Sequence, residues 1–221
     1  MRLLFNFTKE GVLRFISHLD LQRLFIRAFR RANLSIVMKG GFSPQPKLSF
    51  ASALPLGYTS GGEYLEAEFT ESLNPQEVKE RLLPQLPQGI YINHVEEISP
   101  EKKSLMSRLN SAVYLIQFKT AGPLEEKVLI NLVEELLKKE EAVIIRRGKK
   151  KKMKRLNAIP FIINIEVLPM DSQYLGEMRI HIKAGQGGSV KPLEILDLLQ
   201  EGSSLEIIER KAHREKLFIQ N

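Results

Sequence analysis

The chain has 221 residues, of which 43% are hydrophobic and 27% are charged, and its formal net charge is +7. This apolar content is enough for a packed core and excludes a wholly disordered chain. The absence of cysteine excludes disulfides, thiolate nucleophiles and thiolate-held iron–sulfur clusters. The four histidines, at positions 18, 94, 181 and 213, lack the spacing of metal ligands, so we expect neither a metal nor another cofactor.

Positive charge is concentrated in two places along the chain. Residues 1–60 contain nine Lys and Arg against two Asp and Glu, and eight of the ten residues 146–155 are basic. No apolar run is long enough to span a bilayer, and residues 1–11 are too polar for a signal peptide. We therefore expect a cytoplasmic protein whose partner is a polyanion rather than a membrane, with RNA as the first candidate.

The first half of the chain alternates short apolar runs with amphipathic segments. The predicted strands cover residues 3–7, 12–16, 47–54, 64–69 and 90–95. A helix capped by Ser17 is predicted over 18–32, and a second helix opens at Asn74-Pro75. Three glutamates, Glu63, Glu66 and Glu68, indicate that one face of the fourth strand is partly exposed.

The second half repeats this order after a polar segment, residues 97–108, which we interpret as a linker. Its predicted strands cover residues 112–118, 142–145, 161–168, 178–182 and 205–208, with an end at residue 214 as the alternative for the last strand. Helices are predicted to open at Gly122-Pro123 and at Pro192. The sequence therefore predicts an α+β protein of two tandem ferredoxin-like (βαββαβ) domains, each with an added strand. The expected domains are residues 1–98, with the basic helix, and residues 109–221, with a basic hairpin.

The predicted helix 18–32 places four arginines beside its apolar stripe. These are Arg23, Arg27, Arg30 and Arg31. The arginine fork suits phosphate oxygens, so this surface is a candidate nucleic-acid contact. An ordinary solvated helix face, with Asp20 pairing Arg23, is the alternative interpretation.

A proline-stiffened loop follows this helix and is flanked by Lys39 and Lys47. Phe42 in this loop is a candidate for stacking on a base. The simpler interpretation, which we favour for this side chain, is that Phe42 packs on the core. The loop as a whole remains a predicted binding edge.

The basic tract joins two predicted strands and therefore forms a cationic hairpin. Its candidate nucleic-acid contacts are Arg146, Arg147, Lys149, Lys150, Lys151, Lys152, Lys154 and Arg155. Such lysines contact the phosphate backbone without reading sequence. A solvated tip is the alternative. The glycine-rich segment 185–189 matches neither known phosphate-binding fingerprint and is interpreted as a turn.

Several segments match a known family pattern. They are RFISHLD at 14–20, RAFRRA at 27–32, GFSPQPKLSFA at 41–51, LPLG at 54–57, EYLE at 63–66, SLMSRLNSAVY at 104–114 and SVKPLEIL at 189–196. The chain thereby resembles the radical SAM-linked proteins, an uncharacterised protein family of unassigned function. The resemblance implies an association with a radical SAM enzyme that has a cobalamin-binding domain. Without cysteine the chain cannot be that enzyme itself, because the cluster needs thiolate ligands.

The combined expectation is a non-catalytic RNA-binding accessory or substrate-adaptor protein that acts with a radical SAM enzyme in tRNA or rRNA modification. One alternative is a metal-independent endoribonuclease that uses His18, which lies in the first turn of the basic helix. Another alternative is a protein–protein scaffold for an acidic partner. The sequence favours a protein that is not an enzyme.

Overall fold

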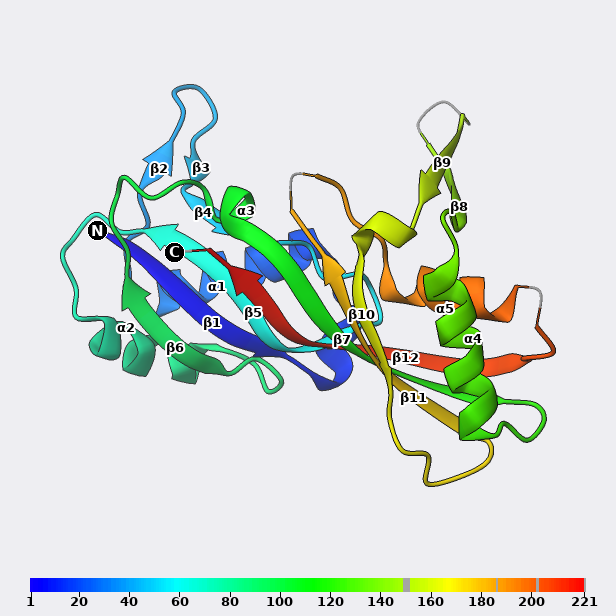
Figure 1. Ribbon diagram of the computed structural model, residues 1–221. Coiled ribbons are helices and arrows are strands. Elements are labelled where there is room, and N and C mark those ends of the chain that lie inside the picture. The colour runs from blue at the N-terminus through cyan, green and yellow to red at the C-terminus, as the bar shows by residue number, and fades with distance from the viewer. Residues whose placement is uncertain (149–151, 186, 202, 221) are drawn as a thin grey trace. The chain divides into compact units, whose positions relative to one another are not determined.

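The computed structural model describes residues 1–148, 152–185, 187–201 and 203–220 (Figure 1). The chain divides into unit 1, Met1–Asn110 with Arg214–Asn221, and unit 2, Ser111–His213. Both units mix helices and strands, which confirms the α+β class. The expected boundaries, 1–98 and 109–221, differ from this division because residues 99–110 and the last eight residues belong to unit 1.

Unit 1 is built on an antiparallel sheet. Its strands are β1 (Arg2–Lys9), β4 (Leu48–Phe50), β5 (Thr59–Glu68), β6 (Ile92–Glu97) and the end of β12 (Ile207–Ile219). The strand order is β12-β5-β1-β6, and β4 also pairs with β5. Its helices are α1 (His18–Arg31), α2 (Pro75–Leu82) and α3 (Leu105–Arg108), with 3₁₀ turns η1 (Gly11–Phe15) and η2 (Leu83–Gln85). A small hairpin, β2 (Met38–Lys39) and β3 (Gln45–Pro46), projects between α1 and β4.

The core of unit 1 lies between the sheet and the helices α1 and α2. Phe5 and Phe7 of β1 contact α1 through Phe29 and Phe25, with ring centroids 5.4 and 4.9 Å apart. Aromatic side chains at this edge-to-face spacing add about 0.5–1.5 kcal/mol each beyond their burial. Three residues of the predicted apolar stripe, Leu21, Phe25 and Ala28, are buried in α1 together with Phe29, whereas Leu24 is half-buried. The arginines of the helix are exposed.

Local capping signals set the ends of both helices. The Ser17 hydroxyl accepts the Asp20 N–H, 3.2 Å away, at the start of α1. Asn33 follows the helix with a φ of +54°, the left-handed conformation that terminates many helices. Asn74 accepts the Gln76 N–H, 2.8 Å away, and Pro75 begins α2, as predicted.

The strand predicted over residues 12–16 is wrong, because this segment forms η1. Both edges of β1 are already paired, with β5 and with β6, so no position remains for a returning strand. Val12 and Phe15 are consequently exposed, by 78% and 60%. The predicted strand over 47–54 is also shorter, since only Leu48–Phe50 pairs with β5.

Two buried carboxylates on β5 correct the expectation of a partly exposed face. Glu63 accepts from Arg214 on β12, 3.1 Å away, and both side chains are at most 3% exposed. Glu66 pairs with Arg108 of α3 and, 2.6 Å away, with Arg2. Burial lowers the pKa of the neighbouring Lys9 below its ordinary value, although the negative charge of Glu63 partly opposes this shift. These pairs attach the C-terminal strand and the α3 segment to the sheet.

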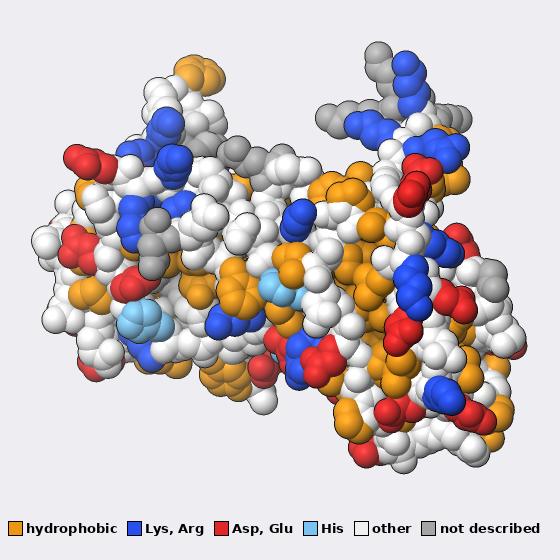
Figure 2. Space-filling view, viewed as in Figure 1, with side chains coloured by type: hydrophobic (Ala, Val, Ile, Leu, Met, Phe, Trp, Pro, Cys, Tyr) orange, Lys and Arg blue, Asp and Glu red, His pale blue; other side chains and the backbone are white. Residues whose placement is uncertain are grey.

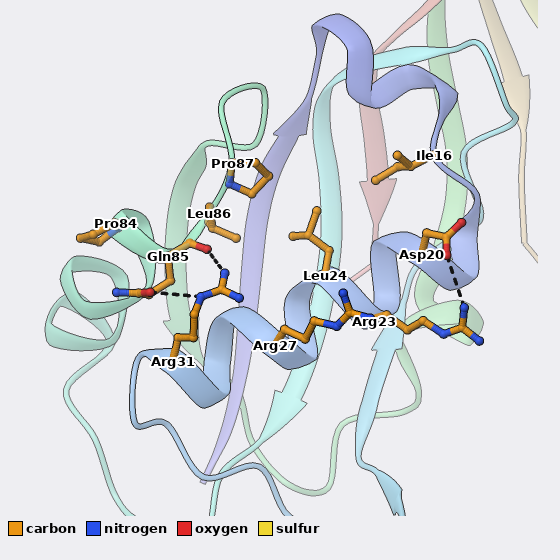
Figure 3. Close-up of a pocket in the computed structure, with 10 residues that line it drawn as sticks. All are labelled: Ile16, Asp20, Arg23, Leu24, Arg27, Arg31, Pro84, Gln85, Leu86 and Pro87. Carbon is orange, nitrogen blue, oxygen red and sulfur yellow. Dashed lines mark hydrogen bonds and ion pairs between the residues drawn. The ribbon is translucent and has the colours of Figure 1, made fainter.

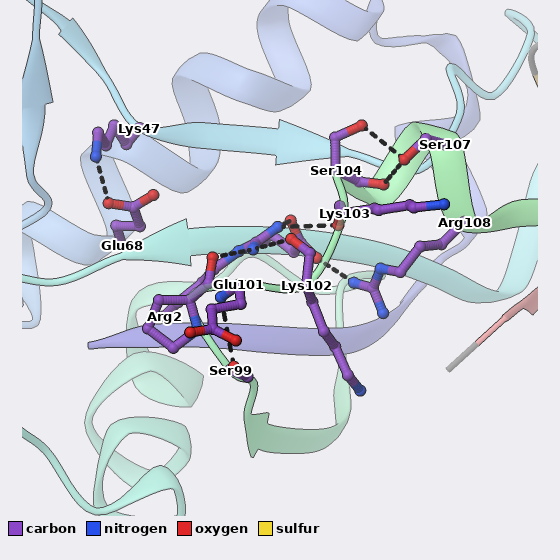
Figure 4. A network of polar contacts seen from close by, with 12 residues as sticks. Arg2, Lys47, Glu68, Ser99, Glu101, Lys102, Lys103, Ser104, Ser107 and Arg108 are labelled. Atoms are coloured by element: carbon purple, nitrogen blue, oxygen red, sulfur yellow. Dashed lines mark hydrogen bonds and ion pairs between the residues drawn. The ribbon is translucent and has the colours of Figure 1, made fainter.

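The segment expected to be a linker therefore packs against unit 1. Arg2 donates to the carbonyls of Lys102 and Lys103, 2.7 and 3.4 Å away (Figure 4). Leu105 and Arg108 of α3 are both buried. These contacts join residues that are far apart in the sequence. The polar composition of residues 97–108 therefore suggested a linker and gave no indication that the segment packs on the sheet.

Unit 2 likewise combines sheet strands with two helices that contact each other. Its elements are β7 (Leu109–Thr120), α4 (Glu126–Lys138), β10 (Ile162–Val167), β11 (Leu175–Lys183), α5 (Pro192–Gln200) and β12. The strand order is β10-β11-β7-β12. The last strand, predicted to start at 205 and end at 208 or 214, instead runs from Ile207 to Ile219.

The predicted strand 142–145 does not join this sheet. Residues Val143–Arg147 (β8) and Met153–Asn157 (β9) pair only with each other among the described strands and form a separate hairpin. Arg146 anchors the hairpin: its Nε and Nη2 donate to the Glu194 carboxylate, 2.8 and 2.5 Å away, and Nη2 also donates to the Ser189 carbonyl. Burial raises the pKa of Glu194, but the hydrogen bonds from Arg146 and from the Lys191 N–H outweigh burial and lower the pKa below its ordinary value of 4.5.

The first prediction concerns the buried carboxylate of β5. Glu63→Gln removes the negative charge facing Arg214 and Lys9, so it is expected to lower the free energy of unfolding by about 3–5 kcal/mol. Glu68→Gln is the matched control, because Glu68 lies on the same strand and pairs with Lys47 at 37% side-chain exposure. Its expected effect is within about 1 kcal/mol. Urea unfolding followed by circular dichroism measures both, and equal effects would contradict the assignment.

The second prediction concerns the hairpin anchor. Glu194→Gln is expected to speed hydrogen exchange of the β8–β9 amides about tenfold at neutral pH, since a charged hydrogen bond contributes about 1.5–3 kcal/mol. Because the folded pKa of Glu194 is lowered, the anchor acts above the ordinary pKa and is lost as pH falls through the lowered value. The variant and the wild type should therefore converge in strongly acidic buffer. Glu166→Gln, which breaks an exposed pair with Arg179, is the control and should leave the hairpin amides unchanged.

Candidate nucleic-acid interface

A groove of about 530 Å³ runs between α1 and the segment after α2 (Figure 3). Arg23, Arg27 and Arg31 line it from the helix, and residues 84–87 line it from the opposite side. Ile16, Leu24 and Leu86 contribute apolar surface. We name this feature the α1 groove.

The three arginines of the groove follow one another at intervals of four residues. A rise of 1.5 Å per residue separates their backbone positions by about 6 Å along the helix. A row of guanidinium groups at this spacing presents several donors to a chain of anions. The sequence predicted the row, but it did not predict the opposite wall, which lies more than fifty residues further along the chain.

The arginines differ in what they contact. Arg23 pairs with Asp20 across 3.4 Å in an exposed ion pair. Arg31 donates to the Gln85 side chain, 3.2 Å away, and to the Gln85 carbonyl, so it ties α1 to the opposite wall. Arg27 lies between them, exposed and without a hydrogen-bond or ion-pair partner among the described residues.

Arg30 is also exposed and without such a partner in the described part of the chain, yet it does not line the groove. All four predicted arginines are therefore on the surface, and three of them share one concave site.

Asp20 places a negative charge at one end of the groove. The Ser17 hydroxyl donates to its carboxylate across 2.6 Å, and this hydrogen bond, assisted by Arg23, lowers the pKa of Asp20. The carboxylate is therefore ionised at neutral pH. It is an acceptor for N–H groups and repels phosphate at that position.

The β2–β3 hairpin carries the remaining candidates of unit 1. Phe42, between the two strands of this hairpin, is fully exposed, so the favoured interpretation, packing on the core, is wrong. Lys39 is exposed and lines a second groove, of about 680 Å³, beside the hairpin. Lys47 pairs with Glu68 across 2.6 Å, which neutralises its charge locally.

Lys and Arg side chains gather on the β8–β9 hairpin of unit 2 (Figure 2). Arg147, Lys152, Lys154 and Arg155 are exposed. Arg146 is half-buried and serves as the anchor, so it is removed from the set of predicted contacts. Lys149, Lys150 and Lys151 lie outside the described residues.

His18 begins α1 and its ring meets the edge of Phe50, with centroids 5.0 Å apart. It is exposed and is not one of the residues lining the α1 groove. Among the described residues no group of acidic or histidine side chains has the arrangement of a metal site. None of the helices in that part of the chain combines the length and apolar character needed to cross a bilayer.

Comparison with solved structures finds three similar folds, one in a complex of proteins and two in H/ACA RNP or sRNP complexes. A chain of a Cbf5–Nop10–Gar1 complex is 14% identical, with a TM-score of 0.53 over 99% of this chain and 50% of that chain. An H/ACA RNP bound to a substrate RNA containing 2′-deoxyuridine gives 14% identity, a TM-score of 0.51 and coverage of 99% and 49%. The archaeal box H/ACA sRNP Nop10–Cbf5 complex gives 13% and 0.51, with the same coverage.

The chain thus spans about half the length of the structures it matches. At these identities the likeness concerns the fold alone. No curated protein matches the sequence. A family model described as an uncharacterized protein conserved in bacteria (DUF2344) matches residues 2–192, and the chain belongs to this family.

Proposed function

We propose that the protein binds RNA, without catalysis, as an accessory or substrate-adaptor protein, and that the α1 groove is its main contact. The observation that carries the proposal is the arginine row, with Arg27 exposed at its centre and unpartnered among the described residues. An arginine held for structural reasons normally has a carboxylate or carbonyl partner, as Arg31 and Arg146 do. A guanidinium left open inside a groove is suited to an anionic ligand.

The solved structures of similar fold give this proposal secondary support. Two of their titles describe an H/ACA RNP or sRNP, and one of these is bound to a substrate RNA. From these structures we take only RNA as the class of ligand for this chain. The specific RNA that we propose is tRNA or rRNA.

We propose further that each unit is a ferredoxin-like domain. In unit 1 the element order is β1-α1-β4-β5-α2-β6, and the pairings β4–β5, β5–β1 and β1–β6 are antiparallel. In unit 2 the order β7-α4-β10-β11-α5-β12 has the hairpin β8–β9 inserted after α4. Both orders are those of the split βαβ arrangement.

The exposed hairpin cations of unit 2, Arg147, Lys152, Lys154 and Arg155, supply a second contact that is not sequence-specific. The alternative of a ribonuclease that uses His18 gains no support, since His18 packs on Phe50 and does not line the groove. A scaffold for an acidic protein remains an outcome of the binding tests.

The third prediction tests RNA binding by the groove. Arg27→Ala is expected to weaken RNA binding about tenfold, since one charged hydrogen bond contributes about 1.5–3 kcal/mol. Arg30→Ala, a matched loss of one exposed charge on the same helix, should weaken it about twofold or less. Fluorescence anisotropy with labelled RNA over a series of salt concentrations measures both, and wild-type affinity should fall steeply with salt. Equal losses would assign binding to charge alone, and no binding at low salt would refute the proposal.

We propose, from the family resemblance, that the protein acts with a cobalamin-binding radical SAM enzyme. The fourth prediction tests this partnership. Mixed with a cobalamin-binding radical SAM enzyme from the same organism, the protein should elute as a complex in size-exclusion chromatography. A radical SAM enzyme without a cobalamin domain is the control and should elute separately. Separate elution of the proposed pair, with and without RNA, would refute the partnership and leave RNA binding untouched.

A further inference from the structure

We infer that the α1 groove receives an unpaired nucleotide, with the base inside the groove and the phosphates along the arginine row. This inference rests on the proposed RNA binding and specifies its substrate as single-stranded RNA. The lining of the groove combines apolar side chains with guanidinium groups and one carboxylate.

The first step is the apolar part of the lining. Leu24 and Leu86 are half-buried, and each presents part of its side chain to the groove while the rest packs on the core. Phosphate gains nothing from such surface, whereas the flat face of a base does. The guanidinium planes of the arginines add a second surface on which a base can stack.

The second step is the carboxylate at the end of the groove. Asp20 is ionised and lies one helical turn before Arg23 and Leu24. A groove that served phosphates alone would be weakened by this charge. A base edge, in contrast, offers amino and imino N–H groups that a carboxylate accepts.

The third step concerns shape. A cavity of about 530 Å³ lies within the range of sites that enclose small ligands. An RNA duplex keeps its bases stacked inside and presents only its backbone and shallow groove, so it would touch the arginines and leave the apolar lining in water. The hydrogen bonds from Arg31 to Gln85 hold both walls together before binding, which reduces the ordering cost of binding.

The fifth prediction compares three labelled ligands of equal length on the 221-residue chain by fluorescence anisotropy: an eight-nucleotide single strand, its blunt duplex, and an abasic ribose-phosphate strand. The single strand should bind about tenfold more tightly than either of the others, because stacking contributes about 1–3 kcal/mol per base. Equal affinity for the abasic strand or for the duplex would overturn the inference and leave RNA binding in place. Failure of all three to bind would instead refute the proposed function.

Paired variants locate the effect in the groove. Leu86→Asn should reduce binding of the single strand to the abasic level without changing abasic binding, a pattern that general destabilisation does not produce. Leu83→Asn is the matched control, because Leu83 lies in the same segment, is 38% exposed and does not line the groove. Arg27→Ala should weaken both strands equally. If thermal melting shows that Leu86→Asn is unfolded, the comparison of the three ligands decides alone.

Discussion

The buried ion pairs on β5 are the interaction on which unit 1 depends. Glu63 and Glu66 lie three residues apart on one strand and pair to opposite faces, one with Arg214 and the other with Arg2 and Arg108. Removing one member of a buried ion pair is costly, because the other charge is then left buried and unpaired. The two carboxylates therefore hold β12 and the α3 segment on the sheet. The sequence around Glu63 and Glu66 does not indicate either contact, because the partners are far away in the chain.

A fixed sheet in turn fixes α1, and α1 carries the candidate site. The same 3.6-residue period that buries Phe25 and Phe29 against β1 turns Arg23, Arg27 and Arg31 outward. The packing of α1 on the core therefore also positions one wall of the groove. The hydrogen bonds from Arg31 to Gln85 hold the other wall beside it. The arginines of the groove are positioned by a helix with a rigid aromatic base, which favours a preformed site over one that orders on binding.

Local signals explain what the sequence could predict. The caps at Ser17 and Asn74, the apolar stripe of α1 and the arginine row all depend on residues within a few positions of one another. The errors arise from nonlocal competition. Residues 12–16 have the composition of a strand, but β1 is already paired with β5 and β6 and cannot accept another strand. Gln85 lines the groove because η2 packs beside α1, a contact between residues far apart in the chain. Phe42 resembles a core residue by type alone, because hydrophobicity does not reveal that a two-strand hairpin lifts it into solvent.

The net charge of the chain overstates the cationic surface available to a ligand. Arg2, Arg108 and Arg214 form ion pairs with the buried carboxylates of β5. Arg146 pairs with Glu194, and Lys47 pairs with Glu68. Two groups of exposed cations in the described part of the chain are chemically distinct: arginines in a concave groove on α1, and a mixture of lysines and arginines on the β8–β9 hairpin. The arginine fork offers directional donors, whereas lysine offers a mobile point charge. Discrimination between RNA ligands should therefore reside in the α1 groove, while the hairpin contributes affinity that any phosphate backbone would satisfy.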